Sequence, residues 1–292
     1  MPFANSKGVQ LYYEEDGQGF PIVFVHEFAG DIRSWEPQLR YFSRRYRCIA
    51  FNARGYLPSD VPEKVSAYSQ AIAADDIASV MRDLRIRKAH VIGCSMGGYA
   101  ALHFGLRHAP LARSLTVIGA GYGSDPDKRA RFLRDTETMA RRFEELGTPE
   151  AISTYQIGPA RVQYQNKDPR GFREFCEEFA EHSAVGSANT LRGVQARRPT
   201  VYSLKRGLAR MKVPTHIISG DEDNQCLDPG IFIKRVCPVA RLTVVAATGH
   251  AVNVEEPDLF NRITDDFLTL VDSRRWRPRD PRSYNPSTMA KK

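Results

Sequence analysis

Short apolar runs alternate with amphipathic stretches along most of the chain. Between most of the runs, apolar residues recur at helical spacing, as in the stretch from Ile72 to Leu84. Strands that are apolar on both faces and alternate with helices predict an α/β fold, with a mostly parallel central sheet flanked by helices. The runs are rich in β-branched and aromatic residues, which favour strands, and they are Gln10–Tyr13, Ile22–Val25, Cys48–Phe51, His90–Ile92, Leu115–Ile118, His216–Ile218 and Leu242–Val245.

The alternation is interrupted once, between residues 124 and 209. This interval has no convincing strand pattern, and the strand pattern resumes at Val213. Its apolar residues form helical stripes, at Phe132, Met139, Phe143 and Leu146 and again at Phe172, Phe175 and Phe179. In open α/β sheets, ligands bind at the edge where the strands end. Because the interval would be inserted between two core strands at that edge, we predict that it forms a helical cap over a ligand site. The alternative is a helical subdomain with only a structural role. The predicted domains are a core at 1–123 and 210–272, a cap at 124–209, and a basic, flexible tail at 273–292.

Composition narrows the class of protein. The chain has 292 residues with 42% hydrophobic content, enough for one large core. Much of its net charge of +8 lies in the tail and no recognition motif accompanies it, so nucleic-acid binding is not expected. Five scattered cysteines favour neither disulfides nor a zinc site. Because no signal-like or membrane-spanning segment is evident, we expect a soluble, cytoplasmic protein without membrane partners.

The segment Gly93–Gly98 (GCSMGG) lies between a predicted strand and a stretch that can form a helix. A serine in the pattern G-x-S-x-G at such a place is typical of a nucleophile, because the glycines permit a tight bend that exposes the hydroxyl. Ser95 is therefore the candidate nucleophile. The neighbouring thiol of Cys94 is expected to fill space in the core, since the bend exposes only the central residue.

A serine hydroxyl needs a base that removes its proton and an acid that orients the base. His250 follows the last predicted strand, directly after Gly249, and is the candidate base. The loop that follows the preceding strand offers carboxylates at residues 221–223, and it comes between Ser95 and His250 in the chain. Loops at strand ends can bring these groups together at one edge of the sheet.

Backbone amides that stabilise a developing oxyanion are the fourth element of such a site. The amide of Met96, next to the nucleophile, and that of Phe28, in a loop after an early strand, are the candidates. His26 is expected to support that loop. Tyr122 lies in a glycine-rich segment that we interpret as a hinge into the cap, and it is a candidate supporting or substrate-site residue.

The order of nucleophile, acid and histidine resembles that of the α/β-hydrolase superfamily. The resemblance extends to about residue 272 and includes Asn52–Asp60, which is similar to the motif D-x-R-G-x-G-x-S, and His250–Pro257, which is similar to G-H-x-x-x-x-E-x-P. It implies that Asp223 is the acid, with Asp221 as the alternative, and that residues 124–209 are the cap domain. Such a triad requires no metal and no organic cofactor.

Two positions depart from the family pattern. The oxyanion loop of the family usually reads His-Gly, whereas Glu27 follows His26 here, and a carboxylate beside an oxyanion opposes its formation. We expect Glu27 to point away or to pair with a cation such as Arg54 or Arg33; alternatively it binds a substrate amine or assists a water molecule. Asn52 stands where the family often has Asp, and no functional conclusion follows from it.

These features predict a serine hydrolase that cleaves small carboxylic esters or lactones through an acyl-enzyme on Ser95. One alternative is a carbon–carbon bond hydrolase of the meta-cleavage type, because the segment Gly93–Gly98 resembles those enzymes too. Another is a receptor that binds a ligand and turns it over very slowly. The expected partner is a small-molecule substrate, and association of the chain into a homo-oligomer stays open.

Overall fold

The computed structural model describes residues 2–284 and 287–289. Its strands form an eight-stranded sheet in the order β1-β2-β4-β3-β5-β6-β7-β8. All seven predicted strands are present, whereas β1 at the N-terminus was not predicted. The strands are β1 (Phe3–Ser6), β2 (Val9–Asp16), β3 (Phe20–Val25), β4 (Tyr46–Phe51), β5 (Ala89–Cys94), β6 (Ala112–Ile118), β7 (Thr215–Gly220) and β8 (Ala240–Val245).

The sheet is parallel from β4 through β8 and antiparallel at one edge. β3 pairs in parallel with β4 and β5, and the parallel pairing continues through β6, β7 and β8. β1 and β2 add an antiparallel edge beside β4. The prediction of an α/β fold with a mostly parallel sheet is therefore confirmed.

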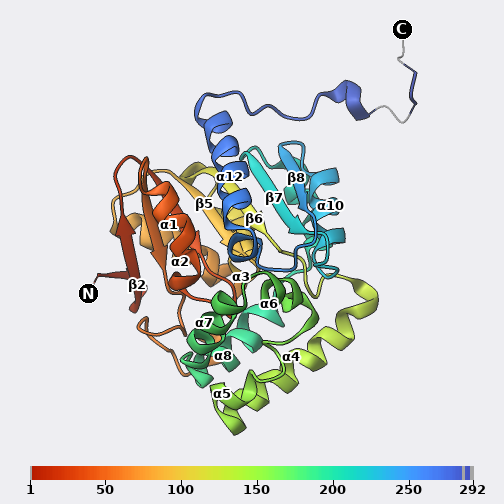
Figure 1. Cartoon of the computed structure of the whole chain (residues 1–292). Helices are drawn as coiled ribbons and strands as arrows, with labels where there is room; N and C mark the ends of the chain where they lie inside the picture. The colour runs from red at the N-terminus through yellow and green to blue at the C-terminus, as the bar shows by residue number, and fades with distance from the viewer. Residues whose placement is uncertain (1, 285–286, 290–292) are drawn as a thin grey trace.

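Helices cover both faces of this sheet (Figure 1). Successive side chains of a strand point to opposite faces, so Val23 of β3 joins one hydrophobic cluster with helices on one side of the sheet, while Phe24 joins another with helices on the other side. The helices and 3₁₀ turns of the core are η1 (Ile32–Trp35), α1 (Glu36–Phe42), η2 (Val65–Ala67), α2 (Gln70–Asp83), α3 (Met96–Arg107), η3 (Ala109–Leu111), α10 (Leu227–Val236), α11 (Val252–Glu255) and α12 (Pro257–Asp272), and the tail contains η7 (Pro281–Tyr284).

Residues 124–209, which lie between β6 and β7 and are called the insert here, contain helices and no strand among the described residues. Figure 1 shows most of it in green and teal below the sheet, at the end where the parallel strands finish. Its elements are α4 (Pro126–Leu146), α5 (Thr148–Ala151), η4 (Pro159–Arg161), α6 (Val162–Lys167), α7 (Pro169–Ala180), α8 (Ala184–Thr190), the π-helical turn η5 (Leu191–Gln195), η6 (Val201–Leu204) and α9 (Lys205–Arg210).

A third hydrophobic cluster joins the insert to the core. Phe143 of α4 and Phe179 of α7 are fully buried, and each contacts the ring of Phe28, with centroids 6.1 and 5.9 Å away. Most of the predicted apolar stripes thus belong to the cluster that contains Phe28, but Phe132 is buried outside it and Leu146 is 47% exposed, so the first stripe was predicted one turn too long. The last part of the insert behaves differently, because Val201 and Leu208 belong to the cluster of the core sheet.

The beginning of the predicted tail packs on the core. The indole of Trp276 donates a hydrogen bond to the carbonyl of Val239 at 2.9 Å, and its ring lies 4.6 Å from that of Phe267. The amide of Arg279 donates to the carbonyl of Pro238 at 2.8 Å. The prediction of a flexible tail applies in part to residues 285–286 and 290–292, which lie outside the described residues.

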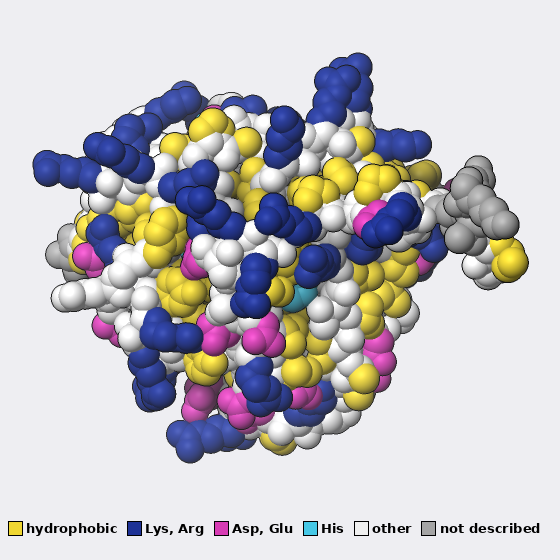
Figure 2. Space-filling model, turned by 90° about the horizontal axis from the view of Figure 1, so that it is seen from above, with side chains coloured by type: hydrophobic (Ala, Val, Ile, Leu, Met, Phe, Trp, Pro, Cys, Tyr) yellow, Lys and Arg dark blue, Asp and Glu magenta, His cyan; other side chains and the backbone are white. Residues whose placement is uncertain are grey.

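Basic side chains are dispersed over the face opposite the insert. Figure 2 shows many Lys and Arg side chains there, with apolar and acidic side chains between them. None of the helices in the described part of the chain has both the length and the apolar character that crossing a bilayer requires.

Candidate active site

Ser95 lies at the bend between β5 and α3, in a backbone conformation that a residue with a side chain rarely adopts. Its φ is 52°, and its amide donates to the carbonyl of Ile118 at 2.8 Å. The neighbouring glycines make this bend sterically feasible. A Cβ on Gly97 would lie 2.0 Å from the oxygen of Val25, and one on Gly93 would lie 2.2 Å from the oxygen of Gly97. The sequence pattern therefore corresponds to a constrained turn that exposes a single hydroxyl.

The imidazole of His250 contacts the carboxylate of Asp223. The distance from Nδ1 to Oδ2 is 2.7 Å, and Asp223 is only 2% exposed. Asp221, the alternative acid, instead accepts a hydrogen bond from the amide of Thr248 at 3.1 Å. The geometry thus favours Asp223 as the partner of the imidazole.

Glu255, the last residue of α11, holds the loop that carries His250 in place. Its two carboxylate oxygens accept hydrogen bonds from the amides of Gly249 and Ala251, at 2.7 and 3.0 Å. The amide of His250 donates to the carbonyl of Ala160 in η4 at 3.1 Å. The loop is therefore anchored on both the core and the insert.

Electrostatics favour the protonated form of His250. Burial opposes protonation, but the adjacent carboxylate of Asp223, with a contribution from Glu27, outweighs it. The pKa of His250 is consequently raised above the usual 6.5. A base with a pKa raised in this way is well suited to accept a proton near neutral pH.

The amides of Phe28 and Met96 are both available for a ligand. Neither has a hydrogen-bond acceptor among the residues that the structure describes. The loop that carries Phe28 is close to the first turn of α3, because the hydroxyl of Tyr56 donates to the carbonyl of Phe28 at 2.9 Å and lies 4.0 Å from the sulfur of Met96. Two free donors next to Ser95 are what an oxyanion hole requires.

His26 supports the loop that carries Phe28. Its Nε2 accepts a hydrogen bond from the amide of Ala53 at 3.0 Å, so the proton resides on Nδ1, which donates to the carbonyl of Glu27 at 2.7 Å. Burial lowers the pKa of His26 to about 4, so the ring is neutral at physiological pH. His26 therefore links the loop to the end of β4.

Glu27 does not pair with Arg54 or Arg33, the two cations expected from the sequence. It forms a two-pronged ion pair with Arg161 of the insert, in which Nη1 lies 2.8 Å from Oε1 and Nη2 contacts Oε2. Both side chains are 4% exposed. Burial raises the pKa of Glu27, but the charge and hydrogen bonds of Arg161 outweigh it, so the pKa is lowered and the carboxylate stays ionised.

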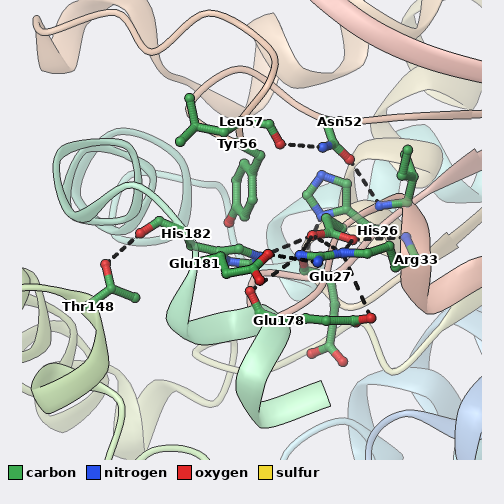
Figure 3. Close-up of polar contacts among 12 residues, drawn as sticks. His26, Glu27, Arg33, Asn52, Tyr56, Leu57, Thr148, Glu178, Glu181 and His182 are labelled. Atoms are coloured by element: carbon green, nitrogen blue, oxygen red, sulfur yellow. Dashed lines mark hydrogen bonds and ion pairs between the residues drawn. The ribbon is translucent and has the colours of Figure 1, made fainter. Parts of the chain in front are cut away.

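The two expected cations have other partners. Arg54 binds both oxygens of Asp76, at 2.6 and 2.7 Å. Figure 3 shows Arg33 extending from the core towards the insert, where Nη1 donates to Glu181 at 2.7 Å. Another nitrogen of Arg33 donates to Asp31, also at 2.7 Å. The choice of partner was wrong because Arg161, 134 positions from Glu27, carries no local signal of proximity.

Two adjoining cavities meet at His250. The first, about 240 Å³, extends beneath α4 and η5, and among the residues that line it are Ser95, Phe28, Arg198 and His250. The second, also about 240 Å³, is lined by residues of η4 and by Asp223 and Gln225. Tyr122, Tyr155 and His250 line both cavities, and Tyr122 is 38% exposed. Ser95 and His250 thus share one cavity, although no hydrogen bond joins their side chains within the described residues.

A sequence profile described as alpha/beta hydrolase fold matches residues 21–257. The chain belongs to this family. Curated relatives include 3-oxoadipate enol-lactonase 1 of Acinetobacter baylyi, 26% identical over 86% of this chain and 89% of that protein. A putative 2-succinyl-6-hydroxy-2,4-cyclohexadiene-1-carboxylate synthase of Bacillus subtilis is 25% identical over 91% of this chain and 97% of that protein.

Solved structures with this α/β-hydrolase fold are similar over nearly the whole chain. The enol-lactonase from Burkholderia xenovorans LB400 has a TM-score of 0.80 and 22% identity, over 92% of this chain and all of that one. A thermophilic esterase from Thermogutta terrifontis has a TM-score of 0.81 and 21% identity, over 92% of this chain and 98% of that one. At this level of identity the similarity establishes the fold.

In this α/β-hydrolase, one group of described side chains has the spacing of a metal site. Ligand atoms of Asp223, Cys226 and His250 lie within 4.8 Å of one another. Hydrogen bonds already account for this proximity, because Asp223 contacts His250 and the thiol of Cys226 donates to the carbonyl of Gly119 at 3.1 Å. The proximity of these three side chains is therefore not by itself a sign of a metal site.

Proposed function

We propose that the chain is a serine hydrolase that cleaves small carboxylic esters or lactones through an acyl-enzyme on Ser95. One observation carries the proposal: Ser95, at a bend where its φ is 52°, lines the same cavity as His250. The Nδ1 atom of His250 lies 2.7 Å from the carboxylate of Asp223, so its Nε2 atom is left to act on Ser95. Nucleophile, base and orienting acid are the three parts of a hydrolytic triad.

The chemistry follows from these positions. As Ser95 Oγ attacks the acyl carbon, Nε2 of His250 takes the hydroxyl proton, and Asp223 stabilises the imidazolium that forms. The amides of Phe28 and Met96 donate to the oxyanion. When the bond to the alcohol breaks, His250 returns the proton to the leaving oxygen. A water molecule, deprotonated by His250, then attacks the acyl-enzyme and releases the acid and Ser95. The hydrogen bond from Ser95 to His250 forms when substrate is bound, as is common for catalytic groups.

The names of similar proteins support an ester or lactone substrate. The relative from Acinetobacter baylyi is named an enol-lactonase, and a structure with a TM-score of 0.81 is described as an esterase. Both reactions transfer an acyl group from an oxygen to water. The two cavities on either side of His250 offer one space for the acyl part and one for the leaving alcohol.

Covalent labelling tests the nucleophile. A fluorophosphonate reacts with a serine that a neighbouring histidine activates, so peptide mass mapping is expected to find the tag on Ser95. Heat-denatured protein is the control, because the tag should depend on the folded site. A tag on another residue, or no tag on folded protein, would remove Ser95 from the proposed role.

A substrate panel separates this function from its two alternatives. p-Nitrophenyl esters and lactones are expected to be hydrolysed faster than a vinylogous diketo acid, the substrate type of carbon–carbon hydrolases. Fast cleavage of the diketo acid without ester hydrolysis would favour that class. Negligible turnover of every compound, together with a ligand-induced rise in melting temperature, would favour a receptor.

The pH dependence of kcat/KM is expected to report His250. Only the neutral imidazole accepts the proton of Ser95, so activity should fall about tenfold per pH unit below the pKa of His250. Because Asp223 raises that pKa, the midpoint of the acid limb should lie above pH 6.5. The variant Asp223→Asn removes the charge and should shift the midpoint to lower pH. Initial rates between pH 5 and 9 give the midpoint for the natural chain and for the variant. An unshifted midpoint in Asp223→Asn would contradict the assignment of Asp223 as the partner of His250.

A further inference from the structure

The cavity that contains Ser95 also contains a buried arginine without an acidic partner. Arg198, in the loop after η5, is 4% exposed and lines this cavity. Its Nη2 donates to the carbonyl of Tyr122 at 2.7 Å, and its guanidinium stacks 3.9 Å above the centre of the Tyr99 ring. Its Nε has no hydrogen-bond partner among the described residues.

The other buried arginines each have the acidic partner that Arg198 lacks in the described part of the chain. Among the described residues, three arginines are buried, and two of them form paired contacts with a carboxylate: Arg54 with Asp76 and Arg161 with Glu27. Arg198 has no ion pair with any described carboxylate. A buried guanidinium stays protonated, and leaving it without a counter-charge is costly. The unpaired member of the three is the one that faces the cavity.

Neighbouring charged residues make the part of the cavity around Arg198 more positive. Arg129 donates to the carbonyls of Gly123 and Ala196, at 2.8 and 2.7 Å, and so lies beside the loop of Arg198. Among the described residues, Asp135 is the one carboxylate that lines the cavity; its side chain is 56% exposed and lies 3.5 Å from Arg131. Burial, with a contribution from Arg129, lowers the pKa of Arg198, and an arriving anion would relieve this cost.

We propose that Arg198 binds a carboxylate on the acyl part of the substrate, so that the preferred substrates are small esters or lactones that carry a free carboxylate. This inference rests on the proposed function. The Nη1 of Arg198, which has no hydrogen-bond partner among the described residues, can donate a charge-assisted hydrogen bond to an oxygen of this carboxylate. The cavity of about 240 Å³ has the volume of roughly eight water molecules at about 30 Å³ each, which suits a short chain between carbonyl and carboxylate.

A matched pair of esters tests the proposal. Mono-p-nitrophenyl adipate and p-nitrophenyl hexanoate have the same leaving group and chain length, and differ in a terminal carboxylate against a methyl group. The ratio of kcat/KM for the charged to the neutral ester is expected to fall roughly 10- to 100-fold in Arg198→Gln, the range of a charge-assisted hydrogen bond. Arg173→Gln, at an exposed position of α7, removes the same charge from a residue that does not line this cavity and is expected to keep the ratio. A folded Arg198→Gln protein with the ratio of the natural chain would overturn the proposal.

A binding measurement covers the case in which Arg198→Gln does not fold. Ser95→Ala protein, which keeps Arg198, is titrated by calorimetry with monomethyl adipate and with methyl hexanoate. Binding of the charged compound at least about tenfold tighter supports the proposal, and equal affinities overturn it. This arm also separates the two hypotheses: tight binding of monomethyl adipate without hydrolysis of any ester by the natural chain would refute the hydrolase and leave the carboxylate site standing.

Discussion

Ser95→Ala is expected to lower kcat for ester hydrolysis by about 10⁴- to 10⁶-fold, because it removes the only atom that can form the acyl-enzyme. The amides of Phe28 and Met96 and the cavity remain, so the variant should still bind substrate and retain slight hydrolysis by direct attack of water. KM, or Kd where turnover is too slow, should therefore change far less than kcat. Burst kinetics with a p-nitrophenyl ester measure the loss, since the initial burst reports formation of the acyl-enzyme.

The neighbouring position supplies the matched control. Cys94→Ala alters a side chain that is 2% exposed and points into the core, where burial raises the pKa of the thiol well above its usual value. A thiol of this kind is a poor nucleophile, so the control should keep the burst and the fluorophosphonate label. If Ser95→Ala retained a tenth of kcat while Cys94→Ala lost it, the assignment of the nucleophile would be wrong.

Local patterns were sufficient to predict most of the sheet. The seven predicted strands are apolar over several residues, because most of them are buried on both faces. β1 differs: it has four residues, its burial alternates, and its only partner is β2. A strand so short and half exposed has no apolar run to recognise, and only its pairing in the folded sheet defines it.

The candidate site was predictable to the extent that each residue follows a strand. Parallel strands end at one edge, so the residues after β3, β5, β7 and β8 must approach one another there. The contact between His250 and Asp223 agrees with that expectation. Arg161 and Arg198 come from the insert, whose helices follow no such rule. Their positions depend on how the insert packs on the core, which the spacing of residues along the chain does not encode.

The sequence predicted the position of Glu255 but not its role. Its place in the motif after His250 was recognised as a resemblance, but the sequence offered no physical reason for a glutamate there. In the structure its carboxylate accepts hydrogen bonds from the amides on either side of His250, at residues 249 and 251. Burial raises the pKa of Glu255 while those amides favour its ionised form. A motif residue can thus act through the backbone of its neighbours.

Breaking the pair between Glu27 and Arg161 from one side is expected to lower the free energy of unfolding by about 3–5 kcal/mol. In Arg161→Met, the carboxylate of Glu27 stays buried without a counter-charge; in Glu27→Gln, the guanidinium does. This is a large part of the roughly 5–15 kcal/mol that stabilises a typical domain. Urea titrations followed by circular dichroism measure the loss, and Arg170→Met, at an exposed pair with Glu174 on α7, is the control that should show little change.

The double variant distinguishes a buried charge from lost packing. Glu27→Gln combined with Arg161→Met leaves no charge at either position, so it should be more stable than either single variant. At low pH, the difference in the free energy of unfolding between the natural chain and Arg161→Met should also become smaller. Without Arg161, burial raises the folded pKa of Glu27 above its unfolded value, so protonation at low pH relieves the penalty that is present in full at neutral pH. If the double variant lost the sum of the two single effects at every pH, packing rather than charge would explain the pair.

The same pair ties the insert to the two loops on which the proposed catalysis depends. Glu27 immediately precedes Phe28, and Arg161 immediately follows Ala160, whose carbonyl accepts the amide of His250 at 3.1 Å. A carboxylate in place of the family's usual glycine is therefore compatible with an oxyanion hole, because the guanidinium neutralises it. The double variant should regain part of the free energy of unfolding but not the full kcat, because its uncharged side chains no longer fix the positions of the loops that carry Phe28 and His250. Recovery of stability and kcat together would show that the pair has no positioning role.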